Sequence, residues 1–215
     1  MSDNYLFVTG KELINFHSNR SSIQIYTIYE GKLYFLLGLD SRHNNKLGNL
    51  GDFGGTPKNN ENSAMTAIRE FNEESKLIFG ILGIESFFEY FSIVRQGPFR
   101  SKNRKCGPNA STKSIAMSKN IKERETKFKD PKIDSEMTIT FIYVESKWLI
   151  KASKIFNETF SDKKESNEIE SLMWFNEDEF IDLIKNKLSD NIMWNKLRRF
   201  YNPIYNKIIE SLKQS

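Results

Sequence analysis

Four glutamates and one arginine gather in a short stretch of the chain and could form a metal-dependent hydrolytic site. The stretch is GGTPKNNENSAMTAIREFNEESKL, residues 54–77. Glu70, Glu73 and Glu74 fall three and four residues apart, so on a helix their carboxylates lie on adjacent turns. Like charges at this spacing repel each other and destabilise a helix. The pattern is therefore typical of a cation site rather than of a solvated surface.

A helix predicted over residues 63–78 places these glutamates beside its apolar face. At about 100° per residue, the three carboxylates form a stripe next to the apolar sector. Carboxylates at the edge of a core are weakly screened by water, so their pKa values rise unless a cation neutralises them. The apolar sector consists of Ala64, Ala67, Ile68, Phe71 and Ile78.

The residue types favour a hard divalent cation. Converging carboxylates supply the oxygen ligands that Mg²⁺ and Mn²⁺ prefer. The chain contains one cysteine, Cys106, and two histidines. A multi-cysteine zinc site and an internal disulfide framework are therefore excluded, and a site built on histidines is not expected. Upstream, Gly54 and Gly55 permit a backbone turn that brings Glu61 back toward the same helix.

The elements around this stretch predict a mixed α/β domain. Residues 23–29 and 32–39 are strand-like and flank the turn-forming pair Glu30-Gly31, so they predict a hairpin. A sheet flanked by helices accounts for the remaining pattern. We predict further strands at residues 50–53, 87–94, 137–144 and 172–175, a helix from residue 177 to about 187, and a helical C-terminal segment, about 190–215, with a break at Pro203.

Length and composition bound the remaining possibilities. The 215 residues suffice for one domain with a sizeable core, and 38% hydrophobic with 28% charged residues is typical of a globular protein. No apolar run approaches the roughly 18 residues of a membrane span. The N-terminus lacks a basic region followed by an apolar stretch. We therefore expect a cytoplasmic protein with no membrane partner.

The net charge of +4 conceals a strongly basic segment. Residues 95–132 carry twelve lysines and arginines against three acidic residues, a net charge of +9, which leaves −5 for the rest of the chain. Serine, asparagine, glycine and proline are frequent there, which predicts an extended insertion. Two interpretations remain open: a segment that binds an anionic partner, or a solvated linker whose charge maintains solubility.

The glutamate-rich stretch resembles the Nudix box, G-x5-E-x7-R-E-U-x-E-E-x-G-U, in which U is an aliphatic or aromatic residue. Lys76 stands where the family has its second glycine, which predicts that the helix continues past it, with Gly80 as the C-cap. The resemblance implies one Nudix-type domain over residues 1–215, an α/β/α sandwich with a mixed sheet that contains the box at residues 55–77. The matching residues are Gly55, Glu61, Arg69, Glu70, Phe71, Glu73, Glu74 and Leu77.

By this resemblance the box binds Mg²⁺ or Mn²⁺ and cleaves a phosphoanhydride bond. Glu70, Glu73 and Glu74 are the expected metal ligands. Arg69 is expected to hold the glutamates through charge-assisted hydrogen bonds, and Glu61 to support the site from the loop. A divalent cation suits this chemistry because it neutralises charge on the pyrophosphate oxygens and activates water.

A general base is also needed, and two positions are open for it. Glu73 or Glu74 is the primary candidate. Some members of the family recruit a glutamate from a later loop, and Glu168 and Glu170 lie just before the strand that contains Trp174. In the alternative interpretation these two are exposed polar residues beside a buried strand. Trp174 is predicted as a core residue rather than a substrate platform.

Capped RNA is the substrate that the charge pattern favours. Arg95 and Arg100 flank Phe99, which combines phosphate contacts with a ring that could stack on a base. Arg95, Arg100, Gly54 and Gly55 are the expected substrate-binding residues. The long insertion and helical extension are similar to the mRNA-decapping Nudix enzymes of large DNA viruses. This similarity implies release of m7GDP from capped RNA by a viral protein in the host cytoplasm.

Two other functions fit the same residues. The first is hydrolysis of a small polyanion, such as a diadenosine polyphosphate, a diphosphoinositol polyphosphate or a nucleoside triphosphate. The second is a non-catalytic Nudix domain that binds RNA or a protein partner. Recognition of a methylated guanine would also need an aromatic platform, for which the sequence offers Phe7, Phe16, Tyr26, Phe53, Phe91 and Trp148.

Overall fold

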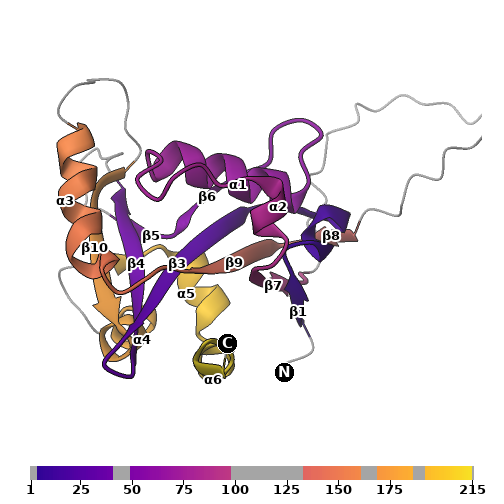
Figure 1. The fold of residues 1–215 in the computed structure, drawn as a ribbon. Coiled ribbons are helices and arrows are strands. Elements are labelled where there is room, and N and C mark those ends of the chain that lie inside the picture. The colour runs from indigo at the N-terminus through magenta and orange to yellow at the C-terminus, as the bar shows by residue number, and fades with distance from the viewer. Residues whose placement is uncertain (1–3, 41–48, 98–132, 161–168, 186–191, 215) are drawn as a thin grey trace, which may run out of the picture.

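The described part of the chain folds into a mixed sheet with helices packed on both faces (Figure 1). The computed structural model describes residues 4–40, 49–97, 133–160, 169–185 and 192–214. The mixed α/β class predicted from the sequence is confirmed. No helix within these ranges has the length and apolar character needed to cross a membrane.

The strands form a large sheet and a small one. They are β1 (Tyr5–Thr9), β2 (Phe16–Ser18), β3 (Ser21–Tyr29), β4 (Lys32–Asp40), β5 (Asn49–Gly51), β6 (Phe53–Gly55), β7 (Phe91–Arg95), β8 (Ile133–Ser135), β9 (Met137–Tyr143), β10 (Ile169–Asn176) and β11 (Ile192–Met193). The large sheet has the order β1-β7-β9-β3-β4-β5-β11, with β10 paired to β4 and β6 paired to β3. Within it, β3 and β9 are parallel, as are β5 and β11. The small sheet pairs β2 with β8.

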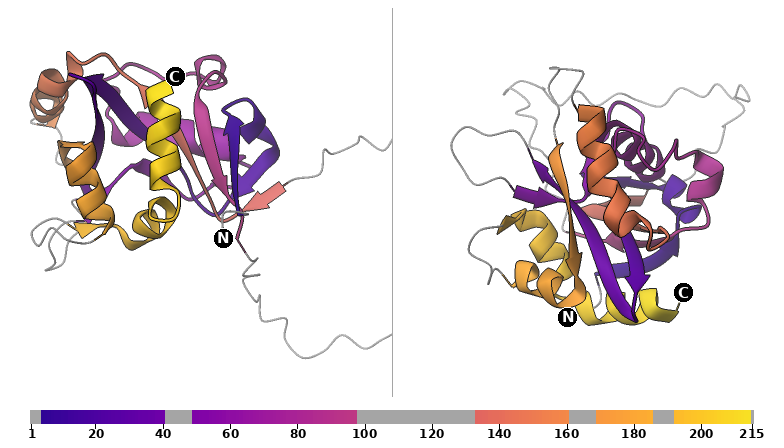
Figure 2. Two further views of the ribbon diagram at one scale, coloured as in Figure 1. Left: turned by 90° about the horizontal axis from the view of Figure 1, so that it is seen from below. Right: turned by 60° about the vertical axis from the view of Figure 1, so that its left-hand side comes forward.

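Helices enclose a core on each face of the large sheet. They are η1 (Glu12–Asn15), α1 (Ser63–Glu74), α2 (Ile84–Phe87), α3 (Trp148–Phe160), α4 (Glu177–Ile184), α5 (Asn195–Tyr201) and α6 (Tyr205–Gln214). One core contains Phe71 of α1 and Phe156 of α3, and the other contains Phe180 of α4 and Tyr201 of α5. Figures 1 and 2 show α1 and the group α4, α5 and α6 on opposite sides of the sheet. The predicted α/β/α layering is therefore present.

Several predicted elements are present with shifted ends. The hairpin is β3 and β4, the strand at residues 137–144 is β9, and Pro203 lies between α5 and α6 as expected. The strand predicted at residues 87–94 begins too early, because Ile84–Phe87 forms the short helix α2 and the strand starts at Phe91. Most of the predicted basic insertion, residues 98–132, lies outside the described residues.

Strands β3 and β4 separate at one end of their hairpin. There they pair with β6 and β5, which lead into the glutamate-rich stretch. The two strands pair as far as Ile25 and Leu36, and beyond that point β6 pairs with β3 and β5 pairs with β4. The buried Gln24 side chain bridges the fork, since its Nε2 donates to the carbonyl oxygens of Ile25 at 3.0 Å and Leu36 at 2.8 Å. Tyr201 of α5 donates to Gln24 Oε1 at 3.2 Å. The amide thus satisfies backbone groups where the strand ladder stops.

Polar side chains fix the start of α1. Asn62 caps the helix, and its side chain accepts the N–H of Met65 at 2.9 Å. The buried Ser63 Oγ lies 2.8 Å from Ser18 Oγ of β2, and Ser18 in turn bonds the hydroxyl of Ser135 in β8. The first turn of α1 is therefore tied to the small sheet.

Two alanines allow α1 to lie close to the sheet. Ala64 and Ala67 are fully buried where α1 contacts β3 and β6. Phe71 packs edge-on against Phe53 of β6, with ring centroids 5.5 Å apart. This packing orients the helix so that its glutamates lie over β6 and the strands beside it.

α1 ends at Glu74, so the predicted extension to residue 78 is wrong. Ser75 is the C-cap, and Lys76 and Leu77 follow with φ values of +52° and +59°. This left-handed region is costly for residues other than glycine. Lys76 makes the chain turn that the glycine of the family pattern would make. Gly80, with φ of +87°, belongs to the next turn and does not cap α1.

The backbone at Lys76 predicts an order of stability for two variants. Both Lys76→Gly and Lys76→Ala lose the contact of the ammonium with the Phe156 ring, 4.5 Å from its centroid. Because only glycine relieves the left-handed strain, Lys76→Gly should be more stable than Lys76→Ala by about 1 kcal/mol. Urea unfolding of the two variants measures this difference. Equal stability, or a more stable alanine variant, would show that α1 continues through this position.

Candidate metal and substrate site

Arg69 joins the glutamates of the stretch. Its guanidinium donates to both carboxylate oxygens of Glu61, through Nε at 2.7 Å and Nη2 at 2.9 Å. Its Nη1 donates to Glu70 at 2.7 Å and to Glu73 at 3.3 Å. The side chains of Glu61 and Glu70 are mostly buried, whereas that of Glu73 is 53% exposed. The arginine therefore offsets like-charge repulsion most strongly for the two buried carboxylates.

The carboxyl group of Glu61 is held in its charged form. The hydrogen bond from Arg69 lowers the Glu61 pKa from 4.5 to about 2, against an opposing effect of burial. The Lys58 N–H at 2.9 Å and the Thr66 hydroxyl at 3.2 Å also donate to Glu61 and lower its pKa. Glu61 thus fixes Arg69 in place across the neutral pH range.

Glu74 binds the backbone of β6. Its Oε2 accepts the N–H of Gly54 at 2.7 Å. Burial raises the Glu74 pKa to about 8, while the positive charge of Arg20 and the Gly54 hydrogen bond act in the opposite direction. The neighbouring negative charges of Glu70 and Asp52 raise it further. A cation bound beside Glu74 would favour its charged form.

A buried ion pair lies next to Gly54 of β6. Arg20 Nη2 is 2.7 Å from Asp52 Oδ1 and donates to the Gly54 carbonyl oxygen at 2.9 Å. The Ser22 hydroxyl donates to the other Asp52 oxygen at 2.5 Å. Arg20 and Asp52 are only 7% and 4% exposed. Because a buried charge without its partner is costly, these contacts fix the position of Gly54.

Gly54 and Gly55 allow close approach rather than a turn. Both lie in β6, and the left-handed backbone that would mark a glycine turn is absent from this strand. A Cβ on Gly55 would lie 2.3 Å from Glu70 Oε1, and one on Gly54 would lie 2.2 Å from Ser22 Cβ. The predicted turn at this pair is therefore wrong, and the glycines are needed because Glu70 and β3 pass directly against the strand.

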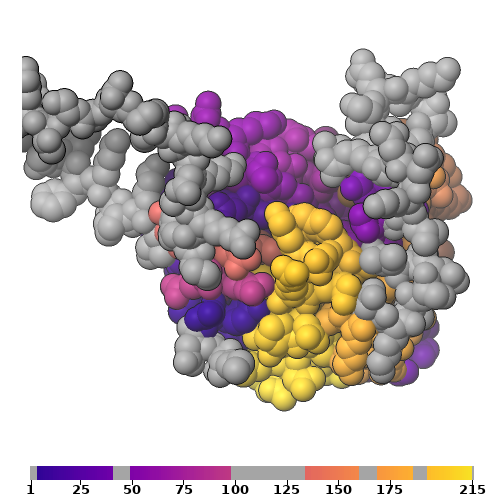
Figure 3. All heavy atoms as spheres, turned by 180° about the vertical axis from the view of Figure 1, so that it is seen from behind, coloured from indigo at the N-terminus to yellow at the C-terminus, as the bar shows by residue number. Residues whose placement is uncertain are grey.

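A cavity of about 420 Å³ lies beside these residues, within the size range of small-ligand sites. Glu70 and Glu74 border it together with the glycine pair. Trp194 and Lys196 of the C-terminal segment also border it, and Figure 3 shows this segment, in yellow, next to the purple part of the chain that contains α1. The lining residues are Arg20, Gly38, Asp40, Asn49, Leu50, Gly51, Asp52, Gly54, Gly55, Thr56, Glu70, Glu74, Ile169, Trp194 and Lys196.

Two further acidic residues predicted for the site, Glu73 and Glu170, do not line the cavity. Glu73 is exposed, and its carboxylate lies 3.6 Å from Lys58 Nζ. Glu170 is exposed on β10, and Glu168 lies outside the described residues. Trp174 packs against the core, as predicted, and its ring N–H donates to a backbone carbonyl on α3 at 3.2 Å.

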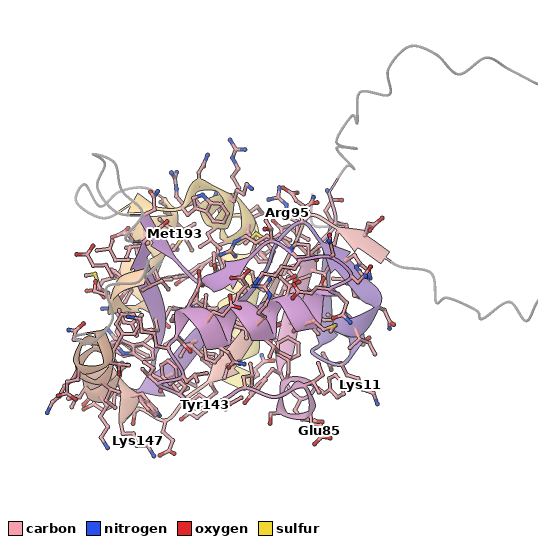
Figure 4. All side chains as sticks on the ribbon, turned by 90° about the horizontal axis from the view of Figure 1, so that it is seen from above. Lys11, Glu85, Arg95, Tyr143, Lys147 and Met193 are labelled. Atoms are coloured by element: carbon pink, nitrogen blue, oxygen red, sulfur yellow. The ribbon has the colours of Figure 1, made fainter. Side chains whose placement is uncertain are left out.

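Arg95, one of the two arginines predicted to bind substrate, does not line the cavity either. Arg95 lies 3.5 Å from the Glu136 carboxylate, and its Nη1 donates to the carbonyl oxygen of Arg199 at 3.3 Å. Figure 4 shows Arg95 well apart from Met193, the neighbour of Trp194 in the chain. Arg100 lies outside the described residues. Arg95 therefore serves the packing of β7 against the C-terminal segment in this structure.

Sequence reasoning missed several cavity residues. The helical spacing of the C-terminal segment predicts Trp194 as a packing residue. Lys196 contributed to the net charge, but the sequence predicted no position for it in the fold. Arg20 and Asp52 are isolated charged residues in or next to segments predicted as strands. The only sequence signal for their pairing was that a charged residue in apolar surroundings needs a partner of opposite charge. The six aromatic residues proposed as base platforms do not line the cavity, and three of them, Phe16, Tyr26 and Phe53, are buried.

The donor chemistry beside the cavity fits a hard divalent cation. Glu70 and Glu74 supply carboxylate oxygens, and the missing side chain of Gly55 lets the Glu70 carboxylate lie directly against β6. Among the described residues, however, no group of three or more histidine, cysteine, aspartate or glutamate side chains is arranged to hold a metal ion. Binding of Mg²⁺ or Mn²⁺ by Glu70, Glu73 and Glu74 together remains a prediction.

Comparison with known proteins gives structural matches without sequence matches. No family model and no curated protein matches the chain. A mutT/nudix family protein from Listeria innocua is 16% identical, with 91% of this chain and 96% of that chain covered and a TM-score of 0.42. An Ap4A hydrolase from C. elegans is 14% identical, with 88% and 96% covered and a TM-score of 0.39. The NUDIX domain of Shewanella oneidensis NrtR, crystallised with ADP ribose, is 11% identical, with 89% and 88% covered and a TM-score of 0.38.

Two of these three proteins carry the Nudix name, and the TM-scores of all three lie below 0.5. A functional conclusion therefore has to come from the site residues themselves, above all from Arg69 and the carboxylates around it.

The Glu61–Arg69 pair predicts a pH-dependent contribution to stability. The folded-state pKa of Glu61 lies below its unfolded value, so its stabilising effect is complete above about pH 4.5 and is lost as the pH falls toward 2. Allowing for partial exposure, we expect Glu61→Gln to lower the free energy of unfolding at pH 7 by about 2 kcal/mol. Urea unfolding at pH 7, 5 and 3.5 should show the difference shrinking only at the lowest pH.

A matched control is Glu145→Gln, which breaks an exposed pair with Lys147. This variant should change the stability by less than about 0.5 kcal/mol. An effect of Glu61→Gln that is equally large at all three pH values would contradict the assignment to charge.

Proposed function

We propose that the chain is a divalent-metal-dependent Nudix hydrolase that cleaves a phosphoanhydride bond of a nucleotide-containing substrate. One observation carries the proposal: Glu70 and Glu74 of the Nudix-like stretch border the same cavity, and Arg69 and the Gly54 N–H hold their carboxylates. An acidic helix without such a role would expose these groups to solvent rather than bury them next to a pocket.

Glu70, Glu74 and Glu73 would hold Mg²⁺ or Mn²⁺, which would neutralise charge on the pyrophosphate oxygens and lower the pKa of an attacking water. Glu73 is exposed and has the longest of the Arg69 contacts, so its side chain can turn toward Glu70 at little cost. Arg69 and Glu61 keep Glu70 in place throughout.

In the proposed reaction the oxygen of a water attacks one phosphorus atom, and the bond from that phosphorus to the bridging oxygen breaks. A carboxylate must accept the proton of the water. Glu74 borders the cavity and Glu73 lies one helical position away, so we retain these two as candidates for the general base. Glu170, exposed on β10, remains the alternative from a later element, with Glu168 beside it in the sequence.

We further propose that capped RNA is the substrate, cleaved to m7GDP and RNA with a 5′-monophosphate. The net charge of +9 over residues 95–132 supports a long polyanion, because phosphate contacts dominate affinity for nucleic acid. A small polyanion, such as a diadenosine or inositol polyphosphate or a nucleoside triphosphate, is the second candidate. The size of the cavity and the presence of Arg20 and Lys196 in its lining support that candidate.

Removal of single carboxylates tests the catalytic proposal. Glu70→Gln, Glu73→Gln and Glu74→Gln should each lower Mg²⁺- or Mn²⁺-dependent turnover by about 10²-fold or more, because each loses a charge that the metal or the water needs. Product is measured with cap-labelled RNA, free nucleotides and inositol pyrophosphates as parallel substrates. Glu85→Gln, an exposed change on α2, is the matched control and should retain full activity.

Turnover by the wild type on none of these substrates, together with normal RNA binding by Glu73→Gln, would favour a non-catalytic RNA-binding domain instead. Turnover that survives in all three carboxylate variants would reject the assigned site.

Exchange of the basic segment tests the choice of substrate. Arg95 pairs with Met137 in the β7–β9 ladder, and the Glu136 N–H donates to the Arg95 carbonyl oxygen at 2.9 Å, so the two ends of the segment meet. A short Gly-Ser linker in place of residues 98–132 should therefore leave the sheet intact. If capped RNA is the substrate, KM for capped RNA should rise at least tenfold and its salt dependence should weaken.

In the same experiment, KM for a free cap analogue should stay within about twofold, which serves as an internal control. Unchanged KM for RNA would reject the RNA-binding role of the segment and favour a small polyanion.

A further inference from the structure

The cavity beside Glu70 and Glu74 is completed by a part of the chain far from the Nudix-like stretch. β11 pairs in parallel with β5, and the Trp194 N–H donates to the Leu50 carbonyl oxygen at 2.9 Å. The carbonyl of Trp194 then accepts the N–H of Arg198 and starts α5. The backbone of Trp194 is thereby fixed from both sides.

The ring of Trp194 is also held in place. The guanidinium carbon of Arg20 lies 4.8 Å from the centroid of a Trp194 ring. Arg20 itself is fixed by Asp52 and by the carbonyl of Gly54, whose N–H binds Glu74. The Arg20 side chain and the backbone of Gly54 therefore link the tryptophan to the Glu74 carboxylate, and the ring and the carboxylates border the same cavity.

Lys196 differs from Arg20 in its freedom to move. Its Nζ lies 5.1 Å from the centroid of the Trp194 ring, and the side chain is exposed. An exposed lysine can leave an aromatic ring at a cost of about 1 kcal/mol or less. It can then bind a phosphate, while Arg20 keeps the ring in position.

We propose that Trp194 is the platform on which the nucleobase of the substrate stacks, with Lys196 beside it as a phosphate contact. Among the described residues that line the cavity, Trp194 is the only aromatic one, and its partly exposed indole offers the flat surface that base stacking needs. The inference rests on the proposed function to the extent that it assigns a nucleotide to this cavity. It goes further by placing the base at the C-terminal segment.

Fluorescence tests the platform without any turnover. The chain has three tryptophans, and Trp148→Phe combined with Trp174→Phe leaves Trp194 as the one reporter. GMP and 7-methyl-GMP contain no phosphoanhydride, so they bind without being cleaved, and each should quench the emission with saturation. Ribose 5-phosphate, which lacks the base, should not.

Kinetics in the otherwise unchanged chain give the second measurement. Trp194→Leu should raise KM for the nucleotide substrate by about 5- to 100-fold, the range that base–aromatic stacking supplies. Trp194→Phe keeps an aromatic ring and should stay within about threefold of the wild type. Neither variant should change KM for inorganic tripolyphosphate, an anhydride without a base, and equal thermal unfolding of the two variants confirms that the fold is retained.

The outcomes separate the two proposals. An equal rise of KM for tripolyphosphate and nucleotide in Trp194→Leu, or the absence of quenching by both nucleotides, would overturn the platform. Saturable quenching by GMP in a protein that hydrolyses nothing would support the platform and reject the enzymatic function.

Discussion

The site depends on the burial of one positive charge, the guanidinium of Arg20. Desolvating such a group costs several kcal/mol unless its partners are well placed. Arg20 meets this requirement in part, with the carboxylate of Asp52, the carbonyl of Gly54 and the ring of Trp194, while its buried Nη1 has no hydrogen-bond partner among the described residues. These partners come from the entry to the Nudix-like stretch and from the C-terminal segment. The need to neutralise one charge therefore brings together parts of the chain that are distant in sequence.

A second unfavourable arrangement of charge lies on α1. Glu70 and Glu74 are spaced to repel each other, and burial makes the Glu74 carboxylate expensive to ionise. Arg69 compensates for Glu70 through a short hydrogen bond, whereas Glu74 receives only a backbone N–H and the field of Arg20. Evolution tolerates such unrelieved charge mainly where function requires it, since a neutral residue would give a more stable helix. The stability lost here is consistent with a site shaped for a cation.

Local features were predictable from the sequence, and features that depend on distant contacts were not. The spacing of Glu70 and Glu74 and the apolar face with Ala64 and Ala67 follow from one helix, so α1 was predicted closely at its start. Its end was wrong because the sequence does not show that Lys76 accepts a left-handed backbone. Strands β1, β2 and β8 were missed because they are short or edge elements, stabilised by partners far away in the chain.

In the candidate site, too, contacts between residues close in the sequence were predictable and contacts between distant residues were not. The roles expected for Glu61 and Arg69 concern neighbours within eight residues, and the structure places these two side chains in contact. Trp194 shows helical spacing with Leu197 and Tyr201, which predicts packing but not which cavity the ring borders. Only the parallel pairing of β11 with β5 decides that, and pairing between such short strands leaves almost no trace in the sequence.

The position of Trp194 after α1 in the chain has a consequence for biosynthesis. During translation at about 5–20 residues per second, α1 is made several seconds before Trp194 emerges. Until β11 docks, Arg20 lacks the ring that covers it, and the Gln24 amide lacks the Tyr201 hydroxyl. A chain synthesised only as far as β10 therefore contains the residues of α1 but lacks Trp194 and Lys196, which border the cavity in the complete fold. A chain that ends before residue 192 would contain the Nudix-like stretch but lack the surface proposed to select the substrate.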